Sequence, residues 1–505
     1  MQTLLIDPLV PRSPVPMHRQ LYQSLRTAIL SCRIRAGTKV PATRQLAAEL
    51  GVSRNTVLAA VDQLLAEGYL EARRGSGTYV ARELPDELLA ARSTPPEPAD
   101  VPPPAGPLSV RGDLMAVRWQ AGASDPYRPA PLRIAIPALD EFPHDTWARI
   151  AARLRRQPPH ELLVYGEPAG YRPLREAIAE WLRATRAVRC SAEDVVITSG
   201  AQQGFWLAAQ LLLNPGEWAW IEEPGYSGIR AALVASGART APVPVDGEGL
   251  NVSAGRRLCS KARIACVTPS HQAALGVTMS LRRRIELLEW ARQESAWVLE
   301  DDHNSEYRYT GRPLASLQGL DHDGRVIYVG TLSKVMFPAL RLGYVVPPAG
   351  LAPAFAAAKG VADWHAPTLL QAEVAEFITG GHLERHIRRM RALYLRRQEV
   401  LVRAAKRDLR GLLEVEPSPA GLHIAAWLPT GADDRQAARA AARHGVFVTP
   451  LSAAYAASAP RRQGLLLGYA CYDEASIERA ICRLRDALCE ASGGADEPCG
   501  PIQAS

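Results

Sequence analysis

The chain has 505 residues, of which 47% are hydrophobic and 22% are charged, and this length exceeds what one hydrophobic core supports, so we expect two or more domains. No apolar run is long enough to cross a bilayer and the N-terminus lacks a signal-peptide pattern, which excludes a membrane partner and predicts a cytoplasmic location. The eight cysteines are scattered without paired C-x-x-C spacing, so we expect free thiols and no metal site, and the net charge of +7 is concentrated near the N-terminus.

Residues 1–83 have the pattern of a small DNA-binding domain. They carry eleven Lys/Arg against six Asp/Glu, a balance of +5. Apolar residues at helical spacing predict three helices, at 17–32, 41–50 and 54–67. Only residues 51–52 join the second helix to the third, which is the turn length of a helix-turn-helix, and 69–80 has the pattern of two strands around a glycine-rich turn. We therefore expect a winged helix-turn-helix.

The N-terminal end of the third helix is the predicted contact with DNA, because in this motif that end enters the major groove. Arg54, Asn55 and Thr56 would face base edges or phosphates there. A glycine in the wing permits close approach to the minor groove. The predicted DNA-binding residues are Arg44, on the DNA backbone, Ser53, as the helix N-cap, Arg54, Asn55, Thr56 and Gly77. The alternative is a helical bundle that serves as a dimerisation cap, with its arginines only solvated.

The next stretch, 84–130, loses both helical and strand periodicity. Residues 95–107 within it are rich in proline and poor in large apolar side chains. Such a composition favours an extended, semi-rigid spacer over a packed element. A second segment without periodicity, 491–505, is expected to be a C-terminal tail.

Residues 131–490 alternate strand-like with helix-like segments. Short apolar runs predict strands at 195–198, 218–222, 263–268, 296–300, 326–329 and 344–346. Helical patterns separate these runs, which indicates a series of βαβ units. We therefore expect an α/β domain with a mostly parallel sheet and helices on both faces.

The strand predicted at 326–329 leads into residues that suit a phosphorylated carbonyl ligand. Lys334 lies just past its end, where an α/β sheet presents chemistry, with hydroxyls at Thr331 and Ser333 and a second cation at Arg341. The lysine amine forms a Schiff base in such a site, while the hydroxyls and the arginine hold the phosphate. A single lysine is more often a surface residue, so this interpretation depends on its neighbours.

A carboxylate is expected beside that lysine. The strand predicted at 296–300 is followed by Asp301 and Asp302. Pyridoxal 5'-phosphate requires such a group, because its ring nitrogen must stay protonated to act as an electron sink and a fixed aspartate raises its pKa. We assign Asp301 to this role over Asp302, because the first residue after the strand points into the crevice.

Together these segments resemble a known family. Residues 301–309, 330–334 and 338–343 are similar to the MocR subfamily of GntR-type bacterial regulators, and 53–57 and 75–80 are similar to GntR-type DNA-binding domains. This subfamily joins a winged helix-turn-helix to a fold type I aminotransferase-like domain. The resemblance covers almost the whole chain. It implies pyridoxal 5'-phosphate as the cofactor and double-stranded promoter or operator DNA as a partner.

The resemblance also implies roles for further residues. The loop at 199–204 is similar to one whose backbone amides hold the cofactor phosphate, so we assign Gly200 and Ala201 there. Tyr226 stands where the family stacks an aromatic ring on the pyridine, although a core tyrosine is the alternative. Tyr165 matches a tyrosine that reaches the cofactor phosphate of the neighbouring subunit, which implies a homodimer.

Several departures from the family pattern bear on the ligand. His303 stands where a tyrosine commonly hydrogen-bonds the ring oxygen of the cofactor, and we keep it as a cofactor-binding residue. Ala274 and Leu275 replace a proline and a small hydroxyl residue. Leu466 lies where an arginine often clamps a substrate carboxylate, and this loss should cost such a ligand about 2–5 kcal/mol. Arg230 is a candidate substitute for that arginine.

These features favour a transcriptional regulator that senses an amine or amino-acid-like effector, or pyridoxal 5'-phosphate itself, through Lys334. The alternative is an active aminotransferase with an appended DNA-binding domain, in which Lys334 would be catalytic. Leu466 argues against efficient turnover of α-amino acids, so we expect residual transaminase activity at most and assign no assured catalytic residue. A third interpretation, a large domain that is only a dimerisation scaffold, conflicts with the presence of Asp301, Ser333 and Lys334.

Overall fold

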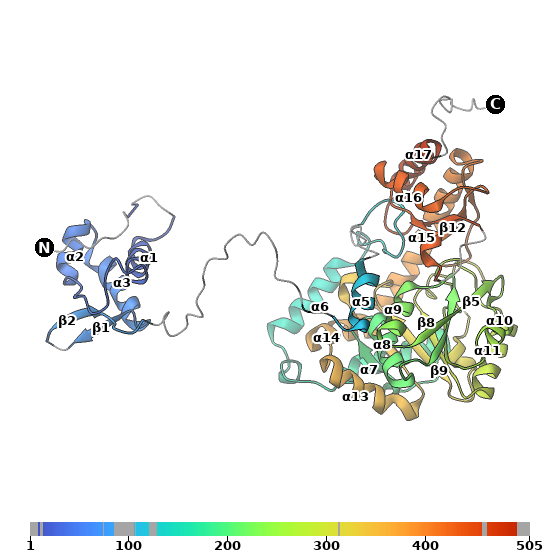
Figure 1. The fold of residues 1–505 in the computed structure, drawn as a ribbon, viewed down its shortest axis with the longest axis horizontal. Helices are drawn as coiled ribbons and strands as arrows, with labels where there is room; N and C mark the ends of the chain where they lie inside the picture. Colours follow the sequence, from blue (N-terminus) through green and yellow to red (C-terminus); the bar gives the residue numbers. More distant parts are fainter. Residues whose placement is uncertain are drawn as a thin grey trace. The chain divides into compact units, whose positions relative to one another are not determined.

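A computed structural model of the chain describes residues 9–10, 14–73, 75–84, 106, 108–120, 129–311, 314–456 and 462–491. The chain divides into two compact units, Met1–Pro107 and Leu108–Ser505, which we describe separately (Figure 1). Most of the spacer predicted at 84–130, and all but the first residue of the tail predicted at 491–505, lie outside the described residues.

The N-terminal unit packs three helices against a β-hairpin. Its elements are α1 (Met17–Leu30), α2 (Thr43–Leu50), α3 (Arg54–Ala66), β1 (Leu70–Arg73) and β2 (Gly77–Val80). The apolar faces of the helices meet in one core around Leu21, Leu46 and Leu64. The strands pair antiparallel, with Leu70 opposite Val80. The predicted winged helix-turn-helix is confirmed, although α1 and α3 end, and α2 begins, one or two residues inside the predicted limits.

The larger unit is built on an eight-stranded sheet in the order β3-β10-β9-β8-β7-β4-β5-β6. Its strands are β3 (Val196–Thr198), β4 (Trp218–Glu223), β5 (Arg239–Asp246), β6 (Gly249–Leu250), β7 (Ala262–Val267), β8 (Trp297–Asp302), β9 (Val326–Thr331) and β10 (Gly343–Val346). β9, β8, β7, β4 and β5 run parallel, which confirms the predicted mostly parallel sheet. β10 runs antiparallel to both of its neighbours, because the short segment 332–342 is no crossover helix.

β5 is absent from the predicted strands. It contains Pro242 and Pro244, and proline lacks the N–H group that an interior strand donates. The structure places β5 next to the edge of the sheet, where it pairs with β4 along most of its length and with the short β6 near its end. A strand with a largely open side accommodates prolines that a central strand excludes.

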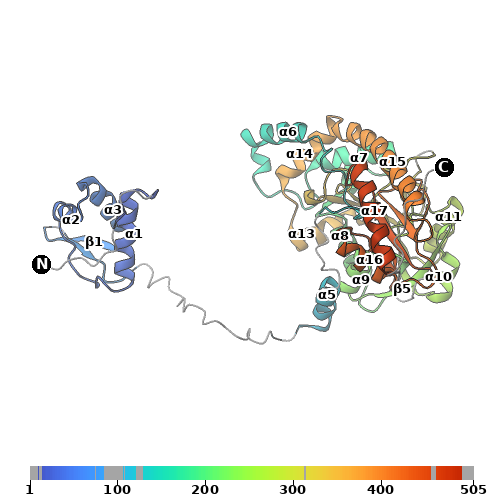
Figure 2. The same cartoon turned by 90° about the horizontal axis from the view of Figure 1, so that it is seen from above.

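Helices cover both faces of the large sheet (Figures 1 and 2). One face carries α8 (Ala201–Leu212), α9 (Ser227–Ala235) and α13 (Ala352–Asp363). The other face carries α7 (Arg172–Arg186), α10 (Val252–Leu258), α11 (Leu281–Gln293) and α14 (Thr368–Thr379). Alternate residues of each strand supply the two cores, so Ile327 packs on the first face and Tyr328 on the second. On the second face Trp220 stacks on Trp290, with ring centroids 4.0 Å apart.

A smaller antiparallel sheet follows in the order β11-β12-β14-β13. Its strands are β11 (Glu414–Val415), β12 (His423–Trp427), β13 (Thr449–Pro450) and β14 (Gly464–Gly468). One face, which includes Ile424 and Leu467, packs in a core with α15 (His382–Asp408), α16 (Asp434–Arg443) and α17 (Glu474–Ala491). The other face carries Ala425 opposite Leu466. None of these strands is among those predicted, and two of them have only two residues.

One helix corrects the predicted spacer. α5 (Val110–Gln120) lies against α9, in a stretch where an extended chain was expected. Ser109 accepts a hydrogen bond from the Gly112 N–H, and the helix contains no proline, so the proline-rich composition ends before it begins. The remaining elements are α6 (His144–Arg156), α12 (Leu317–Leu320) and the 3-10 turns η1 (His160–Leu162), η2 (Ala192–Asp194), η3 (Pro338–Leu340), η4 (Ala349–Leu351) and η5 (Leu451–Ala454).

Three features of the described ranges bear on the class of protein. No helix within them is both long and apolar enough to cross a membrane. The seven cysteines that they contain are free thiols. Nowhere in the same part of the chain do three or more His, Cys, Asp or Glu side chains form a group that could hold a metal ion.

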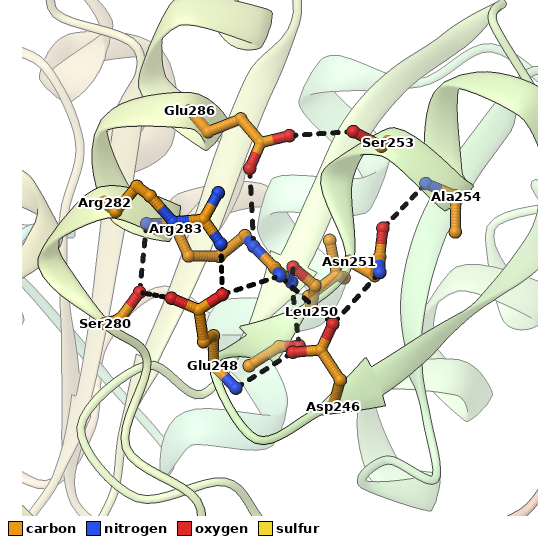
Figure 3. Close-up of polar contacts among 11 residues, drawn as sticks. Asp246, Glu248, Leu250, Asn251, Ser253, Ala254, Ser280, Arg282, Arg283 and Glu286 are labelled. Atoms are coloured by element: carbon orange, nitrogen blue, oxygen red, sulfur yellow. Dashed lines mark hydrogen bonds and ion pairs between the residues drawn. The ribbon is translucent and has the colours of Figure 1, made fainter.

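A buried arginine ties the β5–β6 hairpin to α11 (Figure 3). Arg283 donates from Nη1 to the Leu250 carbonyl at 2.7 Å and from Nη2 to Asp246 Oδ2 at 3.0 Å. Its neighbour Arg282 pairs with Glu248 at the surface. The side chain of Arg283 is 6% exposed and that of Arg282 is 67% exposed. The two arginines therefore offer a matched comparison of a buried and an exposed ion pair.

We expect Arg283→Met to lower the free energy of unfolding by about 1–3 kcal/mol, because the carbonyls and the carboxylate that it serves would lose their donor. Arg282→Ala, the control, is expected to stay within about 0.5 kcal/mol, since exposed ion pairs contribute little. Urea unfolding followed by tryptophan fluorescence measures both. Equal losses in the two variants would show that the buried network does not stabilise the hairpin.

Candidate functional site

Lys334 lies three residues beyond β9, in the loop that leads to β10. Its Nζ donates a hydrogen bond to the Ala135 carbonyl at 2.7 Å, and its own carbonyl accepts one from the Tyr307 hydroxyl at 3.1 Å. Loss of hydration lowers the pKa of the Lys334 ammonium to about 8; Asp301 opposes this shift and the positive charge of Arg341 adds to it. A lysine that loses its proton this readily is suited to nucleophilic attack on a carbonyl.

Asp301 lies on β8, the strand next to β9. The sequence analysis placed it after the strand; the structure extends β8 through Asp302, so both aspartates are strand residues and alternate between faces. Asp302 accepts hydrogen bonds from Arg186 at 2.8 Å and from the Tyr328 hydroxyl at 2.5 Å, so it is already paired. Asp301 is also buried and its Oδ1, like that of Asp302, has no hydrogen-bond partner, but its charge partner is His303 at 3.6 Å rather than an arginine. This difference supports Asp301 over Asp302 as the carboxylate that faces a ligand.

His303 lies beside Asp301, with Nδ1 3.6 Å from Oδ2. Burial lowers the pKa of the imidazole, but the Asp301 carboxylate outweighs that effect and holds the pKa above its usual value. The positive charge of Lys334 acts on the same ring in the opposite sense. Asp301, His303 and Lys334 therefore form one electrostatically connected group at the carboxyl ends of neighbouring strands.

The start of α8, where phosphate binding is predicted, lies beside a guanidinium group. Gly200 precedes the helix with φ 84°. As a glycine it has no side chain with which to cap the first amides of α8. Arg341 Nη2 donates to the Ser199 carbonyl at 3.0 Å. A Cβ at Gly200 would lie 2.9 Å from that Nη2, so only glycine leaves room for the guanidinium. Helix amides beside a fixed guanidinium are suited to a phosphate.

The hydroxyl groups predicted for that phosphate lie at the end of β9 and in the loop that follows it. Thr331 is the last residue of β9, and its Oγ1 accepts a hydrogen bond from the Ser333 N–H at 3.2 Å. Both residues are buried, beside Lys334 in sequence. β10 passes close to Ala201, since a Cβ at Gly343 would lie 2.9 Å from the Ala201 nitrogen. The antiparallel β10 therefore brings the loop that contains Thr331, Ser333 and Arg341 to the start of α8.

Tyr226 lies at the N-terminus of α9 and is 47% exposed, so it is not a core tyrosine. Its ring packs edge-on against Phe205 of α8, with centroids 6.3 Å apart. A pocket beside it is lined by Glu222, Ser227 and Arg230, among others. A half-exposed ring that lines a pocket is suited to stacking on a planar ligand.

Tyr165 is 87% exposed in a single chain. Its ring centroid lies 5.9 Å from that of Trp364, and Leu163, Val164 and Val361 are exposed as well. These five residues, which we call the 163–364 patch, are large apolar or aromatic side chains in contact with solvent. Such a concentration is typical of a surface that another protein covers.

The small sheet supplies side chains that the sequence analysis did not assign. His423, at the start of β12, and His271, after β7, are both buried, with ring centroids 5.4 Å apart, and His271 lies 6.5 Å from His303. His271 belongs to the segment singled out for Ala274 and Leu275, so its position was noticeable; His423 had no signal, because β12 was not among the predicted strands. Leu466 packs against Ala274 in an apolar cluster.

Arg230, considered as a substitute for the arginine missing at Leu466, makes a hydrogen bond to the loop after η5. Its Nη1 donates to the Tyr455 carbonyl at 3.2 Å. This contact joins α9 to the loop after η5 and lines the pocket beside Tyr226. Tyr455 packs in the same apolar cluster as Leu466, and the role of Arg230 as a substitute for the missing arginine stays a prediction.

In the N-terminal unit four of the six predicted DNA-binding residues lie at the start of α3, and the other two lie on α2 and in the wing. Ser53 caps the helix, since its Oγ accepts a hydrogen bond from the Thr56 N–H at 3.1 Å. Arg54 and Asn55 are exposed at the first positions of α3, and Arg44 is exposed in the first turn of α2. Gly77 lies in the wing with φ 116°, and a Cβ there would lie 2.9 Å from Lys39 Cε. Glycine is therefore needed at that position by the backbone itself.

Comparison with known proteins agrees with this organisation. Residues 17–80 match the family described as "Bacterial regulatory proteins, gntR family", and residues 138–484 match "Aminotransferase class I and II". The chain is 41% identical to the "Probable rhizopine catabolism regulatory protein MocR" of Rhizobium meliloti, over 94% of both chains. It is 34% identical to the "HTH-type transcriptional regulator TauR" of Rhodobacter capsulatus, over 95% of this chain and 98% of that one.

Solved structures of aminotransferases also match a large part of the chain. One is LysN, the alpha-aminoadipate aminotransferase of Thermus thermophilus, complexed with N-(5'-phosphopyridoxyl)-L-leucine. It is 29% identical, with a TM-score of 0.66, and the match covers 71% of this chain and 92% of that one. The two regulators match along almost their whole length, whereas the match to the enzyme covers 71% of this chain.

Proposed function

The chain belongs to the MocR subfamily of GntR-type transcriptional regulators, and from that premise we propose that it binds pyridoxal 5'-phosphate at Lys334 and uses it to sense an amine. We assign binding of promoter or operator DNA to residues 1–83 and cofactor binding to residues 131–490. The effector is an amine or amino-acid-like molecule, or the cofactor itself. A bacterial regulator of this kind works in the cytoplasm, where the chromosome lies.

The observation that carries the cofactor proposal is the buried Asp301 carboxylate, whose Oδ1 has no hydrogen-bond partner, beside the amine of Lys334. A buried carboxylate oxygen without a partner costs free energy, so it is expected to have one in the working protein. The protonated ring nitrogen of pyridoxal 5'-phosphate is a partner of the right charge. The nearby amine of Lys334, with its lowered pKa, is the matching partner for the aldehyde of the same molecule.

The remaining predicted residues fit the other parts of that molecule. When bound, the cofactor supplies an aldehyde carbon that condenses reversibly with primary amines. Thr331, Ser333, Arg341 and the amides at Gly200 and Ala201 would hold its phosphate. Tyr226 would stack on the ring, and His303 would donate a hydrogen bond to the ring oxygen. In these roles the residues would bind and orient the ligand, and Asp301 Oδ1 would accept a hydrogen bond from the protonated ring nitrogen and keep it protonated.

A homodimer is part of the proposal. The 163–364 patch leaves Tyr165 and Trp364 exposed, which supports its burial against a second copy of the chain. In that dimer Tyr165 would reach the cofactor phosphate held by the neighbouring chain. Two DNA-binding units would then be related by symmetry, as palindromic half-sites require. Sedimentation velocity of the protein gives its assembly state directly.

Cofactor capture should depend on pH in a way that identifies Lys334. Because the neutral amine attacks the aldehyde, the capture rate should rise with pH and level off above about 8, the pKa of Lys334. For a free lysine analogue in solution, whose pKa is about 10.4, the capture rate should still rise with pH in that range. Stopped-flow absorbance after mixing cofactor-free protein with the cofactor measures the profile. A profile that follows the solution analogue would refute capture by Lys334.

The aminotransferase alternative is less well supported. The relatives that match over the whole chain are regulators, and the position at which family enzymes clamp a carboxylate is occupied by the buried, apolar Leu466. A residual half-reaction remains compatible with the site, because Lys334 and Asp301 are both present. We therefore propose sensing as the use of this domain, with no efficient turnover of α-amino acids.

A further inference from the structure

Three imidazoles gather on the side of the site that faces the small sheet. His303 comes from the loop after β8, His271 from the loop after β7, and His423 from the start of β12, and the positive charge of Lys334 acts on both His303 and His423. His271 is 2% exposed and neither of its ring nitrogens has a hydrogen-bond partner. His423 is 5% exposed and its Nε2 has none. Unpaired, deeply buried nitrogens beside a ligand site indicate groups that a ligand satisfies.

These two histidines are neutral. Burial, together with the charges of His423 and His303, holds the pKa of His271 well below its usual value. Burial and the charges of His303 and Lys334 lower the pKa of His423 to about 4. A neutral imidazole offers one donor and one acceptor, and it forms no ion pair with a carboxylate. Hydroxyl groups, which both donate and accept, are the natural complement of such a pair.

The wall next to the imidazoles is apolar. Leu466 of β14 lies opposite Ala425 of β12, and both pack in a cluster with Ala274 and Leu451. The neighbouring cross-strand pair on the same face, two residues along from Ala425 and Leu466, is His423 and Gly468. The side chains of this wall supply no cation, so desolvating a carboxylate against them is strongly unfavourable. Carbon and hydroxyl groups meet no such penalty.

We propose that the effector is a primary amine whose other polar groups are uncharged hydroxyls, bound by His271 and His423 against the Leu466 wall, and that it carries no carboxylate. This rests on the proposed function, since the amine is sensed by exchange with Lys334. The exchange is redox-neutral: a C=N bond to the effector nitrogen replaces the C=N bond to the lysine nitrogen, and the lysine leaves as a free amine.

Matched pairs of amines test this on the full-length, cofactor-loaded protein. L-alanine is compared with L-alaninol, and L-serine with serinol, each pair differing only in a carboxylate against a hydroxymethyl group. Titration of the visible spectrum should give half-saturation at a concentration at least about tenfold lower for the amino alcohol. 2-Aminopropane, which lacks the hydroxyls, should bind more weakly than serinol. Equal or tighter binding of the amino acids, or of 2-aminopropane, would overturn the proposal.

Variants locate the preference. His423→Leu keeps the volume but removes the ring nitrogens, so it should abolish the advantage of serinol over 2-aminopropane, and His423→Gln should restore part of it. Leu466→Arg should reverse the preference towards the amino acids. His444→Ala, a partly exposed histidine after α16 that pairs with Glu490, is the control and should change neither. An unchanged serinol advantage in His423→Leu would overturn the proposal, whereas a wild-type protein without any visible band would refute the proposed function instead.

Discussion

Replacing Lys334 with alanine is expected to abolish the visible absorbance of the cofactor-loaded protein completely. The band requires a C=N bond between a protein amine and the cofactor aldehyde, and Lys334 is the amine that lies beside Asp301 in this site. The proposed phosphate site at Gly200 and Arg341 is unchanged in the variant, so weak, non-covalent binding of the free aldehyde is expected to persist. Absorbance spectra after gel filtration separate the two states, because only the covalent form survives the column with the protein.

Chemical trapping makes the same test independent of spectral shape. Borohydride reduction of the loaded wild-type protein should fix the cofactor to the peptide that contains Lys334, and the variant should take up no label there. Lys406→Ala is the control, since Lys406 is an exposed lysine paired with Glu416 on the small-sheet side of the unit. A full visible band in Lys334→Ala, or a label on another lysine of the wild-type protein, would contradict the assignment.

The pairing of Lys334 with Asp301 was predictable because parallel strands bring their carboxyl ends to one edge. Two apolar runs, each followed by a chemically active residue, were enough to expect adjacent strands, and β8 and β9 are indeed neighbours. The choice between Asp301 and Asp302 was less secure. Its stated reason, that Asp301 follows the strand, is wrong, since both residues lie in β8. The two side chains alternate between the faces of the sheet, and on its face Asp302 accepts a hydrogen bond from Arg186.

Contacts that join segments far apart in the chain had no comparable signal. His423 comes to the site from a strand whose pairing with β14 spans about forty residues of intervening sequence. β5 was hidden by its prolines, and α5 by the proline-rich stretch before it. In each case tertiary packing determines the secondary structure, and the local sequence pattern either predicts a different structure or gives no prediction. The N-terminal unit was the reverse case, because its helices are strongly periodic and its turns carry glycine.

Replacing Arg54 with alanine is expected to weaken DNA binding by about 1–3 kcal/mol, which is roughly 5- to 150-fold in affinity. Arg54 is exposed at the first position of α3, and the Ser53 cap that sets the start of the helix does not involve its side chain. The variant should therefore fold and keep its cofactor. A fragment selected from random-sequence DNA by the wild-type protein is the probe, and fluorescence anisotropy at several salt concentrations gives the affinity.

The salt series separates two roles for Arg54. If its guanidinium contacts a phosphate, the slope of log affinity against log salt should fall by about one, and all sequences should be weakened alike. If it contacts a base edge, the slope should hold while discrimination at one position relaxes. Arg403→Ala removes the same charge from an exposed position of α15 and should leave both quantities unchanged. Wild-type affinity and specificity in Arg54→Ala would show that the start of α3 is not the DNA-reading end of this domain.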